Sequence, residues 1–152
     1  MESLDPGRAL GAVSEVVRRY SDRIELATLF GSLVRGVWTP MSDVDVGVYP
    51  RDGGLDERLE VSFEVARSAS EAFGVPEDRV DVVFLDEDLP IELLFDAVCR
   101  GVLAYCEDEA FYWEFRDRVT SEYLDFRVFR ERLRLYETYA EALRRRVEQW
   151  GR

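Results

Sequence analysis

The sequence predicts a single α/β (α+β) domain in which a small mixed sheet of about four strands is flanked by helices. Short strand-like runs alternate with segments of helical spacing, which is the pattern of such a domain. No repeat, low-complexity tract or linker divides the chain, and 152 residues is a normal size for one domain. We therefore expect one domain over residues 1–152, with a C-terminal helical extension over about 108–150.

The first half of the chain alternates helix and strand signals. Apolar residues at helical spacing predict a helix over residues 6–20. The apolar run at 24–30 (IELATLF) predicts a strand that ends at Gly31. Residues 31–36 predict a short helix bounded by glycines, and the alternation at 43–49 (DVDVGVY) predicts the second strand.

The second half continues the alternation and then becomes entirely helical. The expected elements are a helix over 55–73 closed by Gly74, a strand over 80–85, a helix from Pro90 to Gly101 and a strand over 102–105. From Asp108 onward we expect two helical segments that meet near residues 124–127. The acidic run Asp86-Glu87-Asp88 is interpreted as a solvated turn and helix start.

Composition excludes several kinds of chemistry. The chain contains no His, Lys or Asn, so Ser-His-Asp or Cys-His catalysis, Schiff-base chemistry and histidine-bound zinc are ruled out. A net charge of −12 disfavours direct nucleic-acid binding, which requires clustered basic residues. The chemistry must therefore use carboxylates, hydroxyls, arginines, thiols and bound metal.

The C-terminal segment differs from the rest of the chain in charge. Residues 127–152 contain eight arginines and four glutamates, a local charge of +4, which leaves −16 for residues 1–126. Apolar residues also recur there at alternating steps of four and three, a heptad-like seam: Phe129, Leu133, Tyr136, Ala140, Leu143 and Val147. We expect this helix to pack against its own acidic domain, with a partner-binding surface as the alternative.

The expected location is the cytoplasm. No apolar run reaches the length of a membrane span, and residues 1–5 lack the layout of a signal peptide. Cys99 and Cys106 are interpreted as small buried residues of a reducing compartment, although the sequence alone leaves a disulfide open.

The stretch from Gly31 to Asp45 is the candidate active site. Gly31 permits a tight turn and the close approach of a phosphate. Ser32 would begin the short helix, where backbone N–H groups form an anion site. Arg35 could reach the same phosphates, with a surface salt bridge as the alternative. Asp43 and Asp45 are two residues apart in a strand, so both carboxylates lie on the same face.

A third carboxylate completes the predicted site. Asp81 lies in the next predicted strand and would join Asp43 and Asp45 if the two strands pair. Hard carboxylate oxygens suit Mg²⁺, and three of them around a triphosphate would give a two-metal site in which Asp81 helps to remove the acceptor's proton. A lone Asp-x-Asp is expected by chance in such an acidic chain, but the joint arrangement is far more specific.

These residues resemble a known signature. Residues 29–36 (LFGSLVRG) followed by 42–46 (SDVDV) are similar to the motif of the polymerase-β-like nucleotidyltransferases, and most closely to that of the minimal nucleotidyltransferase (MNT) antitoxins of HEPN–MNT toxin–antitoxin pairs. The likeness continues through residues 80–83, 89–105 and 121–126. Val34 stands where such proteins often have Ala, a change in packing more than in chemistry.

The resemblance implies a function. Asp43, Asp45 and Asp81 would hold Mg²⁺, and Gly31 and Ser32 would contact the triphosphate of ATP. The implied reaction transfers AMP to a tyrosine hydroxyl of a cognate HEPN ribonuclease toxin, with which the chain would form a hetero-oligomer.

Other functions stay open at this stage. The chain could neutralise a toxin by contact alone, with the seam and basic tail as the interface. A nucleotidyltransferase acting on a small molecule would usually need a further domain. One acting on tRNA is disfavoured by the acidic body, although the arginine-rich tail leaves it open. All three carboxylates are present, which favours the enzymatic hypothesis.

Overall fold

The computed structural model describes residues 5–86 and 88–150. Four strands form one mixed sheet in the order β3-β2-β1-β4. They are β1 (Ile24–Phe30), β2 (Val44–Pro50), β3 (Val80–Phe84) and β4 (Val102–Cys106). β1 pairs antiparallel with both β2 and β4, whereas β2 and β3 are parallel. The predicted mixed sheet of four strands is thus confirmed.

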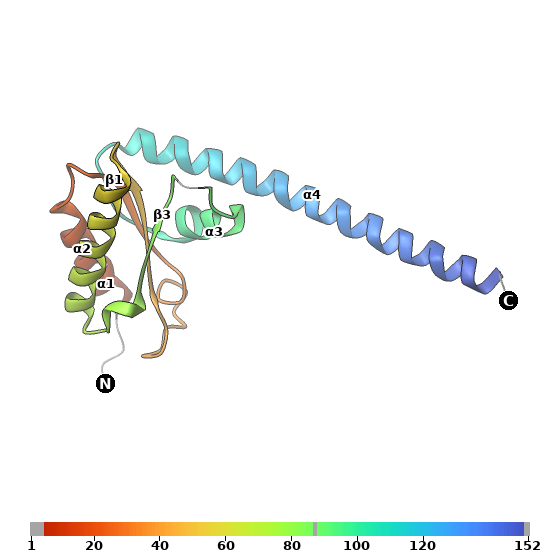
Figure 1. Cartoon of the computed structure of the whole chain (residues 1–152), viewed down its shortest axis with the longest axis horizontal. Coiled ribbons are helices and arrows are strands. Elements are labelled where there is room, and N and C mark those ends of the chain that lie inside the picture. The colour runs from red at the N-terminus through yellow and green to blue at the C-terminus, as the bar shows by residue number, and fades with distance from the viewer. Residues whose placement is uncertain (1–4, 87, 151–152) are drawn as a thin grey trace.

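Helices cover both faces of the sheet. α1 (Pro6–Arg18) and α2 (Leu55–Phe73) lie on one face, and α3 (Ile91–Phe95), η2 (Asp96–Arg100) and the start of α4 (Glu109–Trp150) lie on the other (Figure 1). A short 3-10 turn, η1 (Glu77–Arg79), leads into β3. None of the described helices is both long and apolar enough to cross a membrane.

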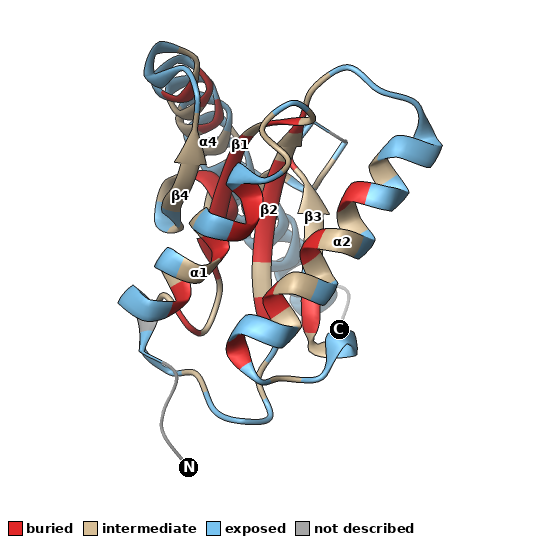
Figure 2. Cartoon of the chain, turned by 90° about the vertical axis from the view of Figure 1, so that its left-hand side faces the viewer, coloured by how far each residue is buried: buried red, intermediate tan, exposed pale blue. Residues whose placement is uncertain are grey.

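The core has two layers because the central strands are buried on both sides. Ala27 and Leu29 of β1 pack toward α1 and α2, while Leu26 and Phe30 pack toward η2 and α4. This is why β1 is an uninterrupted apolar run rather than an alternating one. Figure 2 shows the buried residues concentrated along β1, β2 and the inward sides of α1 and α2.

The segment after β1 is not the predicted short helix. Residues 31–36 form consecutive turns, with positive φ angles at Gly31 (80°) and Gly36 (72°). The Arg35 amide still bonds the Gly31 carbonyl at 3.2 Å, but no regular helix follows. The four residues between the two glycines are too few to offset the cost of helix nucleation.

Two acidic positions also differ from the prediction. β2 begins at Val44, so Asp43 lies one residue before the strand. Asp86 lies in an exposed turn, as predicted, but no helix starts there, and both of its oxygens accept hydrogen bonds from Arg58, at 2.9 and 2.5 Å. The residue that precedes α3 is Pro90, which makes no side-chain capping bond. Glu87 lies outside the described residues.

The C-terminal half of the chain is one helix, not two. α4 runs without a break for 42 residues, because the expected junction at 124–127 (LDFR) contains neither Gly nor Pro. Only its first half packs on the domain, through Tyr112, Phe115 and Val119. Every residue from 127 to 150 is exposed, so the prediction that this segment packs on its own domain is wrong.

Candidate active site

Asp45 and Asp81 are brought together by the pairing of β2 with β3. They are direct partners in the parallel register, so their Cα atoms are level with one another on adjacent strands. Val44, Val46 and Val48 of β2 all belong to the core layer under α1 and α2. Because side chains alternate along a strand, Asp45 points to the opposite face, the one that α3 and η2 partly cover.

Gly31 lies directly against Asp45. Phe30 is the register partner of Asp45 on the other side, so Gly31 follows β1 at the same level of the sheet. A Cβ atom built on Gly31 would lie 2.0 Å from Asp45 Oδ2. The glycine is therefore required both by its positive φ angle and by the space that the carboxylate occupies.

Asp43 joins this pair from the loop that precedes β2. It is exposed, as is Asp81, whereas Asp45 is half-buried. Burial raises the pKa of the Asp45 carboxyl above its ordinary value, and the negative charges of Asp81 and Asp43 raise it further. The positive charge of Arg35 partly offsets this rise in pKa. The three acids and Arg35 therefore interact electrostatically around Asp45.

The loop before Asp43 is held by contacts that sequence reasoning missed. The Thr39 amide donates to Ser42 Oγ at 3.0 Å, and the Ser42 amide donates to the Thr39 carbonyl at 2.8 Å. Arg79, just before β3, donates to the Pro40 carbonyl at 2.6 Å. Arg79 thus ties the loop that carries Asp43 to the strand that carries Asp81. No sequence signal indicates this bond, because its acceptor is a main-chain carbonyl.

Ser32 and Arg35 lie in the turn that follows Gly31. Ser32 is half-buried and Arg35 is exposed. The predicted anion site at a helix N-terminus is absent as such, since residues 31–36 form turns. What remains for a phosphate is the glycine, the serine hydroxyl and the guanidinium, all within five residues of the strand end.

The carboxylates do not form a ready-made cage. Within the part of the chain that the structure describes, no three acidic, cysteine or histidine side chains are arranged to hold a metal ion. The donor set nevertheless fits Mg²⁺, which is usually bound by one or two carboxylates and completes its shell with water and substrate phosphate. A cation between Asp45 and its acidic neighbours would also relieve the repulsion that raises the Asp45 pKa.

Replacing Asp45 with asparagine is expected to stabilise the fold. Because the pKa of Asp45 is higher in the folded chain than in the unfolded one, its ionised form opposes folding once the pH exceeds the folded-state pKa. We expect Asp45→Asn to raise Tm at pH 7 by about 1–3 °C. The gain should shrink as the pH falls toward 4. Thermal unfolding without added metal measures it, and an unchanged or lower Tm would contradict it. Asp78→Asn, an exposed acid outside the site, is the control.

The cysteines lie away from this site. Cys99 and Cys106 are both free thiols and half-buried, so the disulfide that the sequence left open is not formed. Cys99 Sγ lies 3.3 Å from Thr120 Oγ1, which ties η2 to α4.

A glycine turn lies against Asp45 of β2, with Asp43 just before that strand and Asp81 level with Asp45 on the neighbouring parallel strand, which is the arrangement expected of a nucleotidyltransferase. Residues 12–110 match the family model described as polymerase beta, nucleotidyltransferase. The chain belongs to this family.

Individual relatives agree with this assignment. The CCA-adding enzyme of Methanopyrus kandleri is 47% identical over 72 residues, which cover 45% of this chain but only 15% of that enzyme. The chain thus spans a small fraction of that relative's length.

Two solved structures share the fold. A chain of a toxin–antitoxin structure with AMP-PNP has a TM-score of 0.62 and 21% identity, over 86% of this chain and 95% of that one. A chain of the complex between the tri-AMPylated Shewanella oneidensis HEPN toxin and its MNT antitoxin has a TM-score of 0.59 and 19% identity, over 84% and 94%. At these identities the likeness establishes the fold.

Proposed function

We propose that this chain is an MNT antitoxin that transfers AMP from ATP to a tyrosine hydroxyl of a cognate HEPN toxin. The observation that carries the proposal is the register of β2 and β3, which sets Asp45 level with Asp81 on the sheet face next to Gly31. The similar fold of chains in toxin–antitoxin complexes, one with AMP-PNP and one with an AMPylated toxin, supports the choice of nucleotide and partner.

Each residue of the site has a proposed role. Gly31 and Ser32 would contact the triphosphate, and Arg35 would neutralise part of its charge. Two Mg²⁺ ions, held by Asp43, Asp45 and Asp81, would activate the acceptor hydroxyl and stabilise the leaving pyrophosphate.

The proposed reaction is a single displacement. The tyrosine oxygen forms a bond to the α-phosphorus of ATP while the bond to pyrophosphate breaks. Asp81 is the proposed acceptor of the hydroxyl proton, because it is exposed at the sheet edge beside Asp45. AMP on the toxin's tyrosine and free pyrophosphate are the products.

A binding-only antitoxin is the second candidate. It is favoured by one observation, namely that the projecting half of α4 presents apolar side chains to solvent. Neutralisation would then need contact but no nucleotide.

Intact-mass spectrometry distinguishes the two candidates. The HEPN-domain protein encoded nearest to this chain is incubated with the chain, ATP and Mg²⁺, beside the Asp43→Ala/Asp45→Ala variant. Increments of whole AMP units with the wild type and none with the variant are expected. A toxin that is bound and silenced by both proteins without any increment would instead establish the binding-only antitoxin.

A further inference from the structure

The projecting half of α4, residues 129–150, carries an apolar stripe with nothing beneath it. The stripe consists of residues at alternating steps of four and three, which we call the seam: Phe129, Leu133, Tyr136, Ala140, Leu143, Val147 and Trp150. All seven are exposed, and among the large ones the exposed fraction of the residue ranges from 43% at Leu143 to 86% at Trp150. A continuous exposed stripe of this kind marks an interaction surface.

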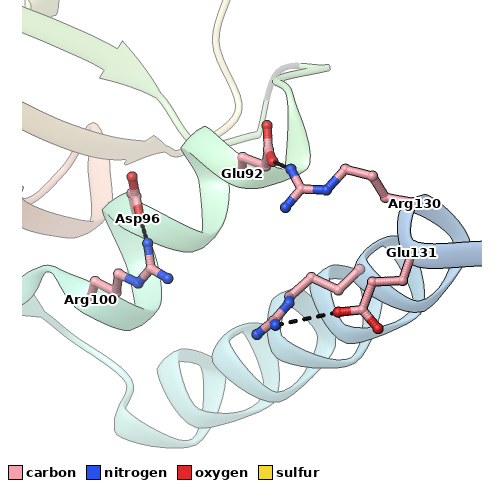
Figure 3. A network of polar contacts seen from close by, with 6 residues as sticks. Glu92, Asp96, Arg100, Arg130 and Glu131 are labelled. Carbon is pink, nitrogen blue, oxygen red and sulfur yellow. Dashed lines mark hydrogen bonds and ion pairs between the residues drawn. The ribbon is translucent and has the colours of Figure 1, made fainter. Parts of the chain in front are cut away.

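The seam does not continue the helix face that packs on the domain further back. That face carries the buried Tyr112, Phe115 and Val119, then Tyr123, which stacks on Phe95, and Arg130. A seven-residue repeat rotates by about 20° per heptad around a straight α-helix, so the seam turns away from the domain side. The first half of α4 covers the domain and the second half projects beyond it (Figure 1). The domain ends near Arg130, whose guanidinium pairs with Glu92 at the start of α3 (Figure 3).

We propose that a second copy of this chain covers the seam, with the two projecting helices packed antiparallel. A copy running in the opposite direction places its own domain beyond the free end of the first helix. A copy running in the same direction would instead place two domains of net charge −16 side by side, which their mutual repulsion disfavours.

The charges beside the seam select the register. Arg130, Glu137 and Arg144 flank one side of the seam, one position after Phe129, Tyr136 and Leu143. In an antiparallel pair each flank meets the same flank of the other copy. If Leu133 lay opposite Leu143 of the second copy, Arg130 would face Arg144 and Glu137 would face Glu137. That register brings only like charges together on this flank.

A shift of one heptad makes the contacts favourable. With Leu133 opposite Trp150 of the second copy, Glu137 faces Arg144 twice by symmetry, and on the other flank Tyr139 faces Arg146. The paired segment is then 133–150, about 27 Å of helix. Its ends stop just short of Arg130, where the domain begins, so this register also fits the available space.

The overall charge asymmetry agrees with this arrangement. In this register Arg144, Arg145 and Arg146 lie level with residues 137–139 of the other copy, about 12 Å of helix from Arg130, where the other domain begins. Residues 1–126 of that copy carry a net charge of −16. The pairing therefore brings each basic segment nearer to an acidic domain than it is within a single chain, where the straight helix keeps the two apart (Figure 1).

Sedimentation equilibrium of the full chain alone tests the proposal. We expect wild type to change from monomer to dimer between about 1 and 200 µM. Leu143→Glu, in the middle of the seam, should weaken the dimer at least about a hundredfold. Leu135→Glu is the matched control, because Leu135 is 70% exposed but lies off the seam, and it should leave association unchanged. Circular dichroism checks that both variants keep their helix.

A charge exchange tests the orientation and register. Arg144→Glu should weaken the dimer, since the introduced carboxylate would face Glu137 of the other copy, and adding Glu137→Arg should restore it. Arg145→Glu makes the same change of charge one residue further along the helix, at a position that points away from the second copy. It should therefore change the affinity of the dimer little. In a parallel pair, or in the antiparallel register with Leu133 opposite Leu143, Glu137 does not face Arg144, and no rescue would occur.

A wild type that stays monomeric at 200 µM would overturn the proposal. If Leu143→Glu then abolished binding to the HEPN protein, the seam would be assigned to that partner. A dimer that Leu143→Glu leaves intact, or that lacks charge rescue, would also overturn it. None of these measurements uses nucleotide or toxin activity, so their outcome is independent of the proposed AMP transfer.

Discussion

Replacing Asp45 or Asp81 with asparagine should reduce AMP transfer at least about a thousandfold, because each substitution removes an anionic ligand from a site that must balance a triphosphate and its cations. Asparagine keeps the shape of the side chain, and neither position is part of the buried apolar core. The fold should therefore survive while the chemistry is lost. Rates are measured as AMP incorporated into the HEPN protein, at saturating ATP and Mg²⁺.

Binding and chemistry can be separated in the same variants. ATP with Mg²⁺ should raise the Tm of the wild type, since a ligand at a hundred times its Kd contributes about 2.7 kcal/mol. This rise should be much smaller in Asp45→Asn. The exposed Asp78→Asn, three residues before Asp81, is the control and should keep both activity and the ligand-induced rise. Activity within tenfold of wild type in both site variants would contradict the proposed metal site.

Gly31→Ala is expected to have the second-largest effect. Its Cβ atom would lie 2.0 Å from Asp45 Oδ2, so the carboxylate must move, and a displacement of about 1 Å can cost about a hundredfold in rate. Because alanine is strained at a φ angle of 80°, the substitution should also lower the free energy of unfolding by about 1–2 kcal/mol. Both quantities are measured, by AMP incorporation and by urea unfolding.

Gly36→Ala separates the two causes. Gly36 also has a positive φ angle, 72°, but a Cβ atom there meets nothing within 4 Å. This variant should lose a similar amount of stability while keeping nearly full activity. Equal losses of activity in the two variants would show that the turn as a whole, rather than the contact with Asp45, is what the reaction requires.

The strands and the acidic triad were predictable from local patterns. The apolar run at 24–30 and the alternation at 43–49 indicated β1 and β2. A strand buried on both faces has a continuous apolar sequence, and one with a polar face has an alternating sequence, so both patterns can be recognised locally. The pairing of β2 with β3 was stated only as a condition for Asp81 to join the site. The register satisfies that condition with Asp45 level with Asp81.

The turn after β1 was harder to predict. Glycines at both ends of residues 31–36 suggested helix boundaries, whereas both adopt positive φ angles within a run of turns. Propensity does not distinguish these cases over six residues, because the outcome depends on the strand end and the Asp45 carboxylate against which the turn packs. The bond from Arg79 to the Pro40 carbonyl is of the same kind, a long-range contact to the main chain.

Local patterns in the chain were enough to identify the four strands, the helices other than the one expected at 31–36, three acids near a glycine turn, and a basic, heptad-patterned end. Each of these depends on neighbours a few residues apart. Contacts between distant residues determine that Gly31 touches Asp45, that Arg79 holds the loop before Asp43, and that α4 leaves its own domain after Arg130. A heptad stripe records that a helix face is to be covered, but not by what. Here the domain ends before the stripe does.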